Sequence, residues 1–173
     1  MFGVYDNFPD ISHGIIGLSS PTSTERLQRA IVQSLHRANR SRKELDFPEF
    51  ARHNIKAALE FGIAEGVTFS YIDDEILGCC HERLGEQPFP ALDLLCIVRY
   101  YVTEEKRRRP LKFDYYMLRF LFQEAEVELH IYHERGTRRL SIEDLTGFLT
   151  GGINQELARS GSKPLKMTHM RVL

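Results

Sequence analysis

Hydrophobic and polar residues follow two periodic patterns along this chain. One pattern predicts helices and the other predicts strands. Thr22 and Glu25 have the spacing of a capping box, in which each side chain satisfies a free backbone N–H of the other residue. Apolar residues at helical spacing follow this pair and predict a helix over 23–39. Further helices are predicted over 74–84, ended by a glycine, and over 141–158.

Strict alternation of apolar and polar residues predicts the strands. This pattern indicates strands over 13–19, 67–71, 92–103, 111–122 and 125–134, of which the last three are long and form a meander. Residues 55–64 also alternate, which favours a strand, but Ala57 and Ala58 favour a helix on propensity. Both interpretations of 55–64 therefore remain open.

The order of these elements predicts one α+β domain over residues 1–159. Its mainly antiparallel sheet has five or six strands, with helices packed on one face. Residues 160–173 contain Lys163, Lys166 and Arg171 but no acidic residue. We expect them to form a basic, mobile C-terminal tail.

The meander has two contrasting faces. If Gln123 and Glu124 form a turn, one face is almost wholly apolar and becomes the predicted core. In that register Arg119 opposes Glu128, and Met117 lies between Ile97 and His130. The opposite face mixes aromatic and charged side chains, a composition typical of interfaces. Its interface candidates are Arg99, Tyr101, Phe113, Tyr115, Met117, Arg119, His130 and Tyr132. A loop, a helix or a second subunit covering this face is the simplest explanation.

Composition removes several classes of function. The chain has 173 residues, 42% hydrophobic and 27% charged, with a net charge of −1. These values are those of an ordinary globular domain and predict no general attraction to nucleic acid or membranes. No apolar run approaches the ~20 residues that span a bilayer. Cys79, Cys80 and Cys96 form no disulfide framework, and no signal peptide is evident, so we expect a cytoplasmic protein.

Basic residues gather where the meander's turns bring them together. In an antiparallel meander, the exits of the first and third strands lie at the same end of the sheet. The residues placed there are Lys106, Arg107, Arg108, Arg109, Lys112, Arg135, Arg138 and Arg139. Such a cluster suits phosphate or an acidic partner, although runs of like charge are more often simply solvated.

Candidate catalytic and metal-binding groups are few. His130 and His133 point to opposite faces of a strand and cannot share an ion. Cys79, Cys80 and His81 lack a second ligand cluster. Asp114 lies opposite His133 and suggests an acid–histidine pair, but no serine or cysteine nucleophile is placed beside them. We therefore assign no catalytic, metal or cofactor residue.

These features favour a non-catalytic binding or assembly protein. The first hypothesis is protein–protein contact, with a homo-oligomer or another protein, through the aromatic and arginine-rich sheet face. The alternative is binding of nucleic acid or another polyanion at the basic end. A small-ligand enzyme of unknown class is the third.

Overall fold

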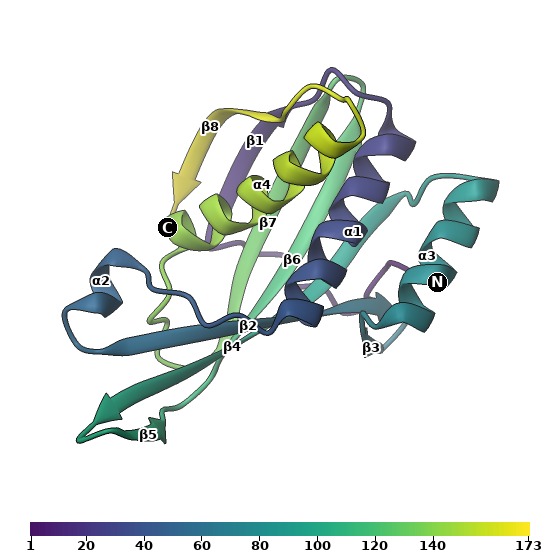
Figure 1. The fold of residues 1–173 in the computed structure, drawn as a ribbon. Helices are drawn as coiled ribbons and strands as arrows, with labels where there is room; N and C mark the ends of the chain where they lie inside the picture. Colours follow the sequence, from purple (N-terminus) through teal and green to yellow (C-terminus); the bar gives the residue numbers. More distant parts are fainter.

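A computed structural model describes residues 1–173 and shows an α+β fold built on one antiparallel sheet (Figure 1). Its eight strands are β1 (Gly14–Ser19), β2 (Ile55–Glu65), β3 (Thr68–Tyr71), β4 (Ala91–Glu104), β5 (Arg107–Pro110), β6 (Asp114–Gln123), β7 (Glu126–Arg135) and β8 (Lys166–Val172). The order across the sheet is β3-β2-β4-β6-β7-β1-β8, and β5 pairs with the C-terminal end of β4. The fold class is therefore as predicted, with more strands than the expected five or six.

Helices cover one face of this sheet. They are α1 (Thr24–Ser41), α2 (Pro48–Ala51), α3 (Asp74–Glu86) and α4 (Ile142–Arg159). In Figure 1, α1, α3 and α4 lie on the same side of the sheet, and α1 packs against both of the others. The N-cap of α1 is Ser23, one residue after the predicted Thr22, and its Oγ accepts from the Arg26 N–H. No helix is long and apolar enough to cross a membrane.

The two interpretations of residues 55–64 are resolved in favour of the strand. Ile55, Ala57, Leu59, Phe61 and Ile63 are all buried and belong to β2. This strand pairs with β4 on one side and with β3 on the other. Pairing on both sides and burial of the alternate side chains outweigh the helix preference of alanine.

Both faces of the meander contain the predicted side chains, but the predicted pairing is wrong by two residues. The turn between β6 and β7 is at Glu124 and Ala125, and Ala125 has a φ of 59°. A shift of two residues leaves every side chain on its original face, so hydrophobic alternation cannot detect it. Met117 consequently pairs with Leu95 and Tyr132 instead of Ile97 and His130. The neighbours of Arg119 are Asp93 and His130, not Glu128.

The end of the chain is part of the sheet. Residues 166–172, which we expected to belong to a tail outside the domain, form β8 and pair with β1. Most of their side chains are exposed, so the strand has little of the apolar alternation that reveals a buried strand. The four residues of β5, all exposed, escaped prediction for the same reason.

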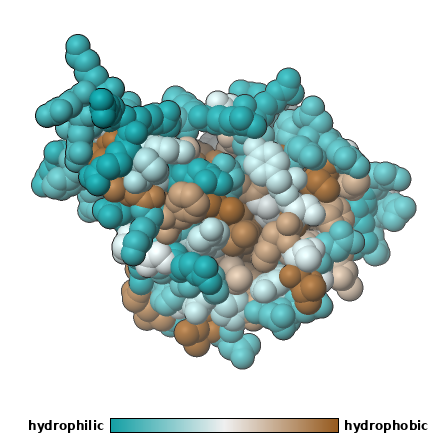
Figure 2. Space-filling model, turned by 90° about the horizontal axis from the view of Figure 1, so that it is seen from below, coloured by the Kyte–Doolittle hydropathy of each residue, from teal (hydrophilic) through white to brown (hydrophobic).

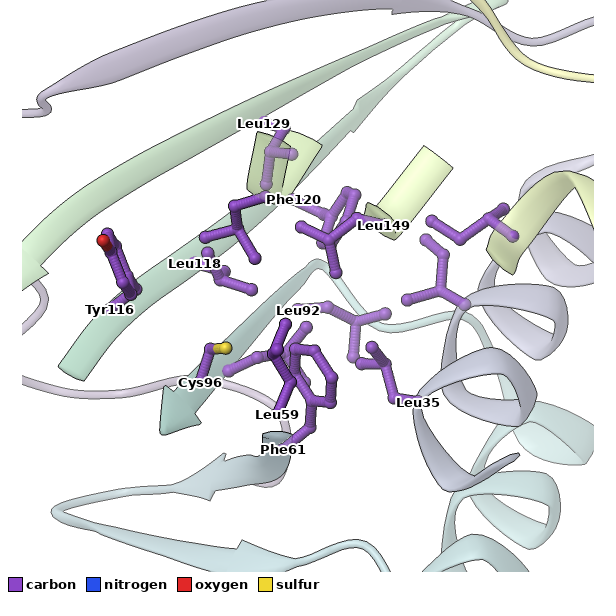
Figure 3. Close-up of a cluster of buried hydrophobic side chains, with 14 of the residues drawn as sticks. Leu35, Leu59, Phe61, Leu92, Cys96, Tyr116, Leu118, Phe120, Leu129 and Leu149 are labelled. Atoms are coloured by element: carbon purple, nitrogen blue, oxygen red, sulfur yellow. The ribbon is translucent and has the colours of Figure 1, made fainter. Parts of the chain in front are cut away.

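The core lies between the helices and the apolar face of the sheet. Figure 3 shows Leu35 of α1 and Leu149 of α4 packed towards Leu92, Leu118 and Phe120 of the sheet. All of these side chains are almost completely buried. The close packing of these helices on the apolar face leaves the opposite face of the sheet for other contacts.

Candidate functional site

The first thirteen residues cross the sheet face that the helices leave open; we call them the N-terminal strap. In Figure 1 this purple segment passes behind the sheet on its way to β1. Near its start, the Gly3 N–H donates to the Ala64 carbonyl of β2. Near its end, the Ser12 hydroxyl lies 3.1 Å from His130 Nδ1 of β7. The strap therefore provides part of the cover that we expected for this face.

The strap follows a single cross-strand row formed by Asp93, Arg119 and His130. The Tyr5 N–H donates to Asp93 Oδ2 at 2.7 Å. The guanidinium of Arg119 lies 4.3 Å from the centre of the Phe8 ring, a cation–π contact. The polar side chains of this row therefore already have partners within the chain.

Asp93 and Arg119 form a bidentate ion pair under the strap. Arg119 Nε and Nη2 each donate to one carboxylate oxygen of Asp93 at 2.7 Å. The Asp93 side chain is fully buried, and its hydrogen bonds raise the pKa of Arg119. Arg119 is therefore already neutralised and is not a free cation for a ligand.

The predicted interface residues divide into a covered group and an uncovered one. Arg119 and His130 contact the strap, and Tyr132 stacks on the His13 ring with 4.8 Å between ring centres. Met117 is only 8% exposed. Arg99, Tyr101, Phe113 and Tyr115 stay partly exposed, together with Leu95 and Ile97. We call these six residues the uncovered patch.

The positive charge within the uncovered patch is also balanced by acids of the same chain. Arg99 Nε donates to Glu60 Oε1 at 2.9 Å, a bond that raises the pKa of Arg99. The guanidinium of Arg99 lies 4.6 Å from the centre of the Phe113 ring. Beside the patch, Arg108 stacks on Tyr101 and forms an ion pair with Glu44. Seen from below, away from α1 and α4, the molecule shows apolar surface bordered by hydrophilic surface (Figure 2).

The predicted basic cluster is divided among three places. Lys106, Arg107, Arg108 and Arg109 lie at the hairpin that joins β4 to β5, and Arg109 pairs with Glu104 at 3.1 Å. This hairpin projects from the lower left of Figure 1.

The other four basic residues lie outside that hairpin. Lys112 and Arg135 line one hollow beside the start of β6. Arg138 and Arg139 belong to the segment between β7 and α4, and their backbone N–H groups bind Asp114. Their side chains are half-buried and exposed respectively.

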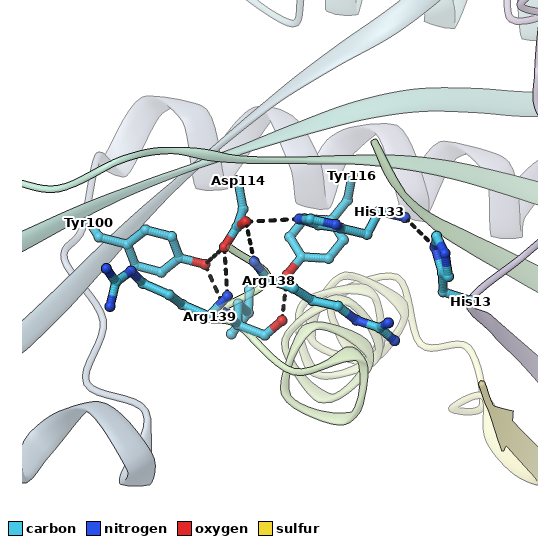
Figure 4. Close-up of polar contacts among 8 residues, drawn as sticks. His13, Tyr100, Asp114, Tyr116, His133, Arg138 and Arg139 are labelled. Carbon is cyan, nitrogen blue, oxygen red and sulfur yellow. Dashed lines mark hydrogen bonds and ion pairs between the residues drawn. The ribbon is translucent and has the colours of Figure 1, made fainter. Parts of the chain in front are cut away.

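Asp114 lies at the centre of a buried polar network (Figure 4). Its carboxylate accepts from the Tyr100 hydroxyl, from His133 Nε2 at 2.8 Å, and from the N–H groups of Arg138 at 2.6 Å and Arg139 at 2.8 Å. Burial alone would raise the pKa of Asp114, but these hydrogen bonds outweigh it and lower the pKa. The predicted acid–histidine pair is therefore present.

This network has a structural role. The Tyr100 hydroxyl accepts from the Leu140 N–H at 2.9 Å, and the Tyr116 hydroxyl donates to the Leu140 carbonyl. Burial raises the pKa of both tyrosines, so their hydroxyls stay protonated. No serine or cysteine donates to or accepts from Asp114 or its histidine partner. The network fastens the segment before α4 to the start of β6.

The histidines and cysteines also lie apart. His130 contacts Glu128 and Ser12 on one face, whereas His133 contacts Asp114 on the other. The three cysteines are free, and burial raises the pKa of Cys80 to about 12, which leaves an unreactive thiol. No group of three or more histidine, cysteine and carboxylate side chains is placed to hold a metal ion.

The sequence does not predict the strap, because residues 1–10 show no hydrophobic periodicity. The signal there is a set of three aromatic residues, Phe2, Tyr5 and Phe8, which could have indicated packing on a surface. No protein-family model matches the chain, and no curated protein or solved structure is significantly similar to it.

Proposed function

We propose that this protein is a non-catalytic assembly module whose uncovered patch binds a second copy of the chain. The observation that carries the proposal is the partial exposure of Ile97, Tyr115 and their neighbours on a face where the strap covers the rest. Aromatic and aliphatic side chains at the centre of a patch, bordered by polar groups, are typical of protein interfaces.

The charge pattern supports a protein occupant. Arg99 is paired with Glu60, and Arg108 is paired with Glu44. A polyanion would have to compete with these carboxylates for each guanidinium, whereas a protein surface can pack against the neutralised pairs.

Balanced charge also favours a second copy over an unlike partner. In a twofold interface the same surface faces itself, so a patch with an excess of one charge would repel its own copy. Arg99 and Arg108 are each matched by a glutamate, whereas the unpaired Lys112 and Arg135 lie at the edge of the patch, where a twofold interface can leave them in solvent.

Solution mass tests this proposal. We expect the wild-type mass to reach twice the 20.1 kDa of the chain as concentration rises, measured by sedimentation equilibrium. Met117→Glu is a poor probe because Met117 is only 8% exposed, and a carboxylate there would perturb folding. Ile97→Lys is sharper, because the lysine has Glu60 as a cross-strand neighbour and the single copy can still fold.

Val67→Lys provides the matched control, since Val67 is 66% exposed at the β2–β3 turn, outside the patch. We expect Ile97→Lys to give a folded monomer and Val67→Lys to associate like the wild type. A wild type that stays monomeric at every concentration contradicts the proposal. Association that Ile97→Lys leaves unchanged places the interface elsewhere and also overturns it.

A second candidate function is polyanion binding by the β4–β5 hairpin. It is supported by Lys106 and Arg107, which are exposed and form no ion pair, while Arg108 and Arg109 are paired with Glu44 and Glu104. A salt titration of oligonucleotide binding tests it, because each neutralised phosphate releases a counterion and makes the affinity salt-dependent.

A further inference from the structure

A hollow of about 610 Å³ lies beside the uncovered patch, where β6 begins and β7 ends. The residues that line it include Phe113, Tyr115, Lys112 and Arg135. No acidic residue belongs to the lining. Its volume lies within the roughly 300–1,000 Å³ range of small-molecule sites.

The fold builds this hollow from a strand irregularity and a tight turn. Tyr115 pairs with Arg135 across β6 and β7, and the register shifts immediately after Tyr115. Gly136 follows with a φ of 111°, in the region that favours glycine. A Cβ on Gly136 would lie 2.3 Å from both Asp114 Oδ1 and the Phe113 carbonyl oxygen. Glycine is therefore required for the β7 end to approach β6 so closely.

The cations of this hollow differ from the other basic residues near the patch. Arg99, Arg108 and Arg109 each have a glutamate partner. Lys112 and Arg135 are exposed and take part in no side-chain hydrogen bond or ion pair of the structure. These two cations are free to bind an anion at no cost to an existing pair.

Besides the two cations, the candidate site contains two aromatic side chains. Phe113 and Tyr115 are alternate residues at the start of β6, and their ring centres are 6.5 Å apart. Arg99 occupies a face of the Phe113 ring at 4.6 Å and holds that ring in place. No aromatic partner other than Phe113 contacts the ring of Tyr115. A planar ligand can therefore stack on Tyr115 with little rearrangement.

We propose that this hollow binds a nucleotide, with its base against Tyr115 and Phe113 and its phosphate on Arg135 and Lys112. Arginine offers a phosphate two parallel N–H donors, and base–aromatic stacking tolerates any base. The ligand is either a free mononucleotide or a nucleotide unit of a single strand, because both carry the same base and phosphate. This inference needs no second copy, but Phe113 and Tyr115 also belong to the uncovered patch, so self-association would compete with the ligand. The titrations are therefore made at concentrations at which the chain is monomeric.

Calorimetric titration at low salt tests the site with four probes: adenosine monophosphate, adenosine, inorganic phosphate and a short single-stranded oligonucleotide. We expect the monophosphate to bind about tenfold more tightly than adenosine or phosphate alone, because both halves of the site are used. If the oligonucleotide binds much more tightly than the monophosphate, and its affinity rises with its length, the natural ligand is a single strand. If the oligonucleotide and the monophosphate bind with equal affinity per site, the natural ligand is the free nucleotide.

Variants separate the two halves. Arg135→Gln and Tyr115→Leu should each weaken monophosphate binding about tenfold, and only the first should spare adenosine binding. Lys112→Gln should give a smaller loss of binding, and because Lys112 is exposed the substitution should have little effect on folding. Arg26→Gln, at an exposed position of α1 outside both the hollow and the β4–β5 hairpin, is the matched control and should bind like the wild type. Absence of monophosphate binding, or binding that Arg135→Gln and Lys112→Gln leave unchanged, overturns the proposal.

Discussion

The two faces of one sheet bury carboxylates in different ways. Asp114 on the helix-covered face and Asp93 on the strap-covered face are both 0% exposed. Asp93 is neutralised by the bidentate guanidinium of Arg119 and by one backbone N–H from the strap. Asp114 has no arginine or lysine ion pair and accepts from a tyrosine, a histidine and two backbone N–H groups.

This difference shows what each face contributes. The helix-covered face joins distant parts of the chain around an apolar core, so changes there should reduce stability most. The opposite face is closed by a short strap and by ion pairs whose arginines stay partly exposed, so changes there, apart from the buried Asp93 carboxylate, should affect binding more than folding. Substitutions on the two faces test this division of roles.

Asp114→Asn should lower the free energy of unfolding by about 3 kcal/mol, because the amide NH₂ must face groups that are themselves donors. Urea denaturation measures the change. A loss below about 1 kcal/mol would mean that the network is not a major source of stability.

Leu94→Ala and Leu95→Ala compare the faces directly, since these neighbours on β4 point to opposite sides of the sheet. Leu94 is fully buried, so its truncation should cost about 3 kcal/mol, within the usual range for a core leucine. Leu95 is partly exposed, so its truncation should lower the free energy of unfolding by only about 1 kcal/mol. Equal losses in urea denaturation would contradict the division between the faces.

Acid should weaken the helix-covered face. The pKa of Asp114 is lower in the folded chain than in the unfolded one, so the unfolded chain binds a proton more readily. The stability that Asp114 contributes is complete above its unfolded pKa of about 4 and is lost as pH falls through the folded pKa. Thermal melts from neutral to acidic pH should show this loss, and Asp114→Asn should make it smaller. An unchanged acid dependence in the variant would exclude Asp114 as its source.

Phe8→Ala should loosen the strap with only a modest effect on global stability. It removes the ring under Arg119 and should cost about 1 kcal/mol. Hydrogen exchange provides the local measurement, because the Tyr5 N–H that binds Asp93 should exchange faster while the amides of β6 stay protected. Uniform acceleration of both would show that the strap is part of the core's cooperative unit.

Replacing Arg107, Arg108 and Arg109 with alanine should have the smallest effect on folding, because these side chains are exposed and surface ion pairs contribute little. The melting temperature should stay unchanged. If the hairpin binds nucleic acid, the slope of log affinity against log salt should fall by about 2 for a single strand. An unchanged slope would show that these arginines do not contact the nucleic acid and are simply solvated.

Several elements could be predicted because their evidence is local. The helix that begins after Ser23, the three long strands, and the assignment of Leu94 and Leu95 to opposite faces all follow from spacing along the chain. The acid–histidine pair of Asp114 and His133 was also predictable, because a strand register wrong by two residues still places them at the same end of the sheet. The register itself depends on where the turn at Ala125 falls, and periodicity does not contain that information.

The candidate site was less predictable. The aromatic and arginine-rich face was visible in the sequence, but nothing there showed that Asp93 would neutralise Arg119 or that Glu60 would neutralise Arg99. Glu60 and Arg99 are 39 residues apart in the chain and meet only because β2 lies beside β4. The free cations Lys112 and Arg135 could be distinguished from the paired arginines only once these partners were known.

The sequence by itself determined the fold class, most helix and strand positions and the composition of both sheet faces, because hydrophobic periodicity reports which side of each element is buried. Only the tertiary structure decided which half of the second face stays exposed, which arginines remain free, and that Lys166–Val172 completes the sheet. These outcomes depend on contacts between residues far apart in the chain. Such contacts join segments that are neighbours only in the assembled sheet, and they leave no periodic signal in the segments that make them.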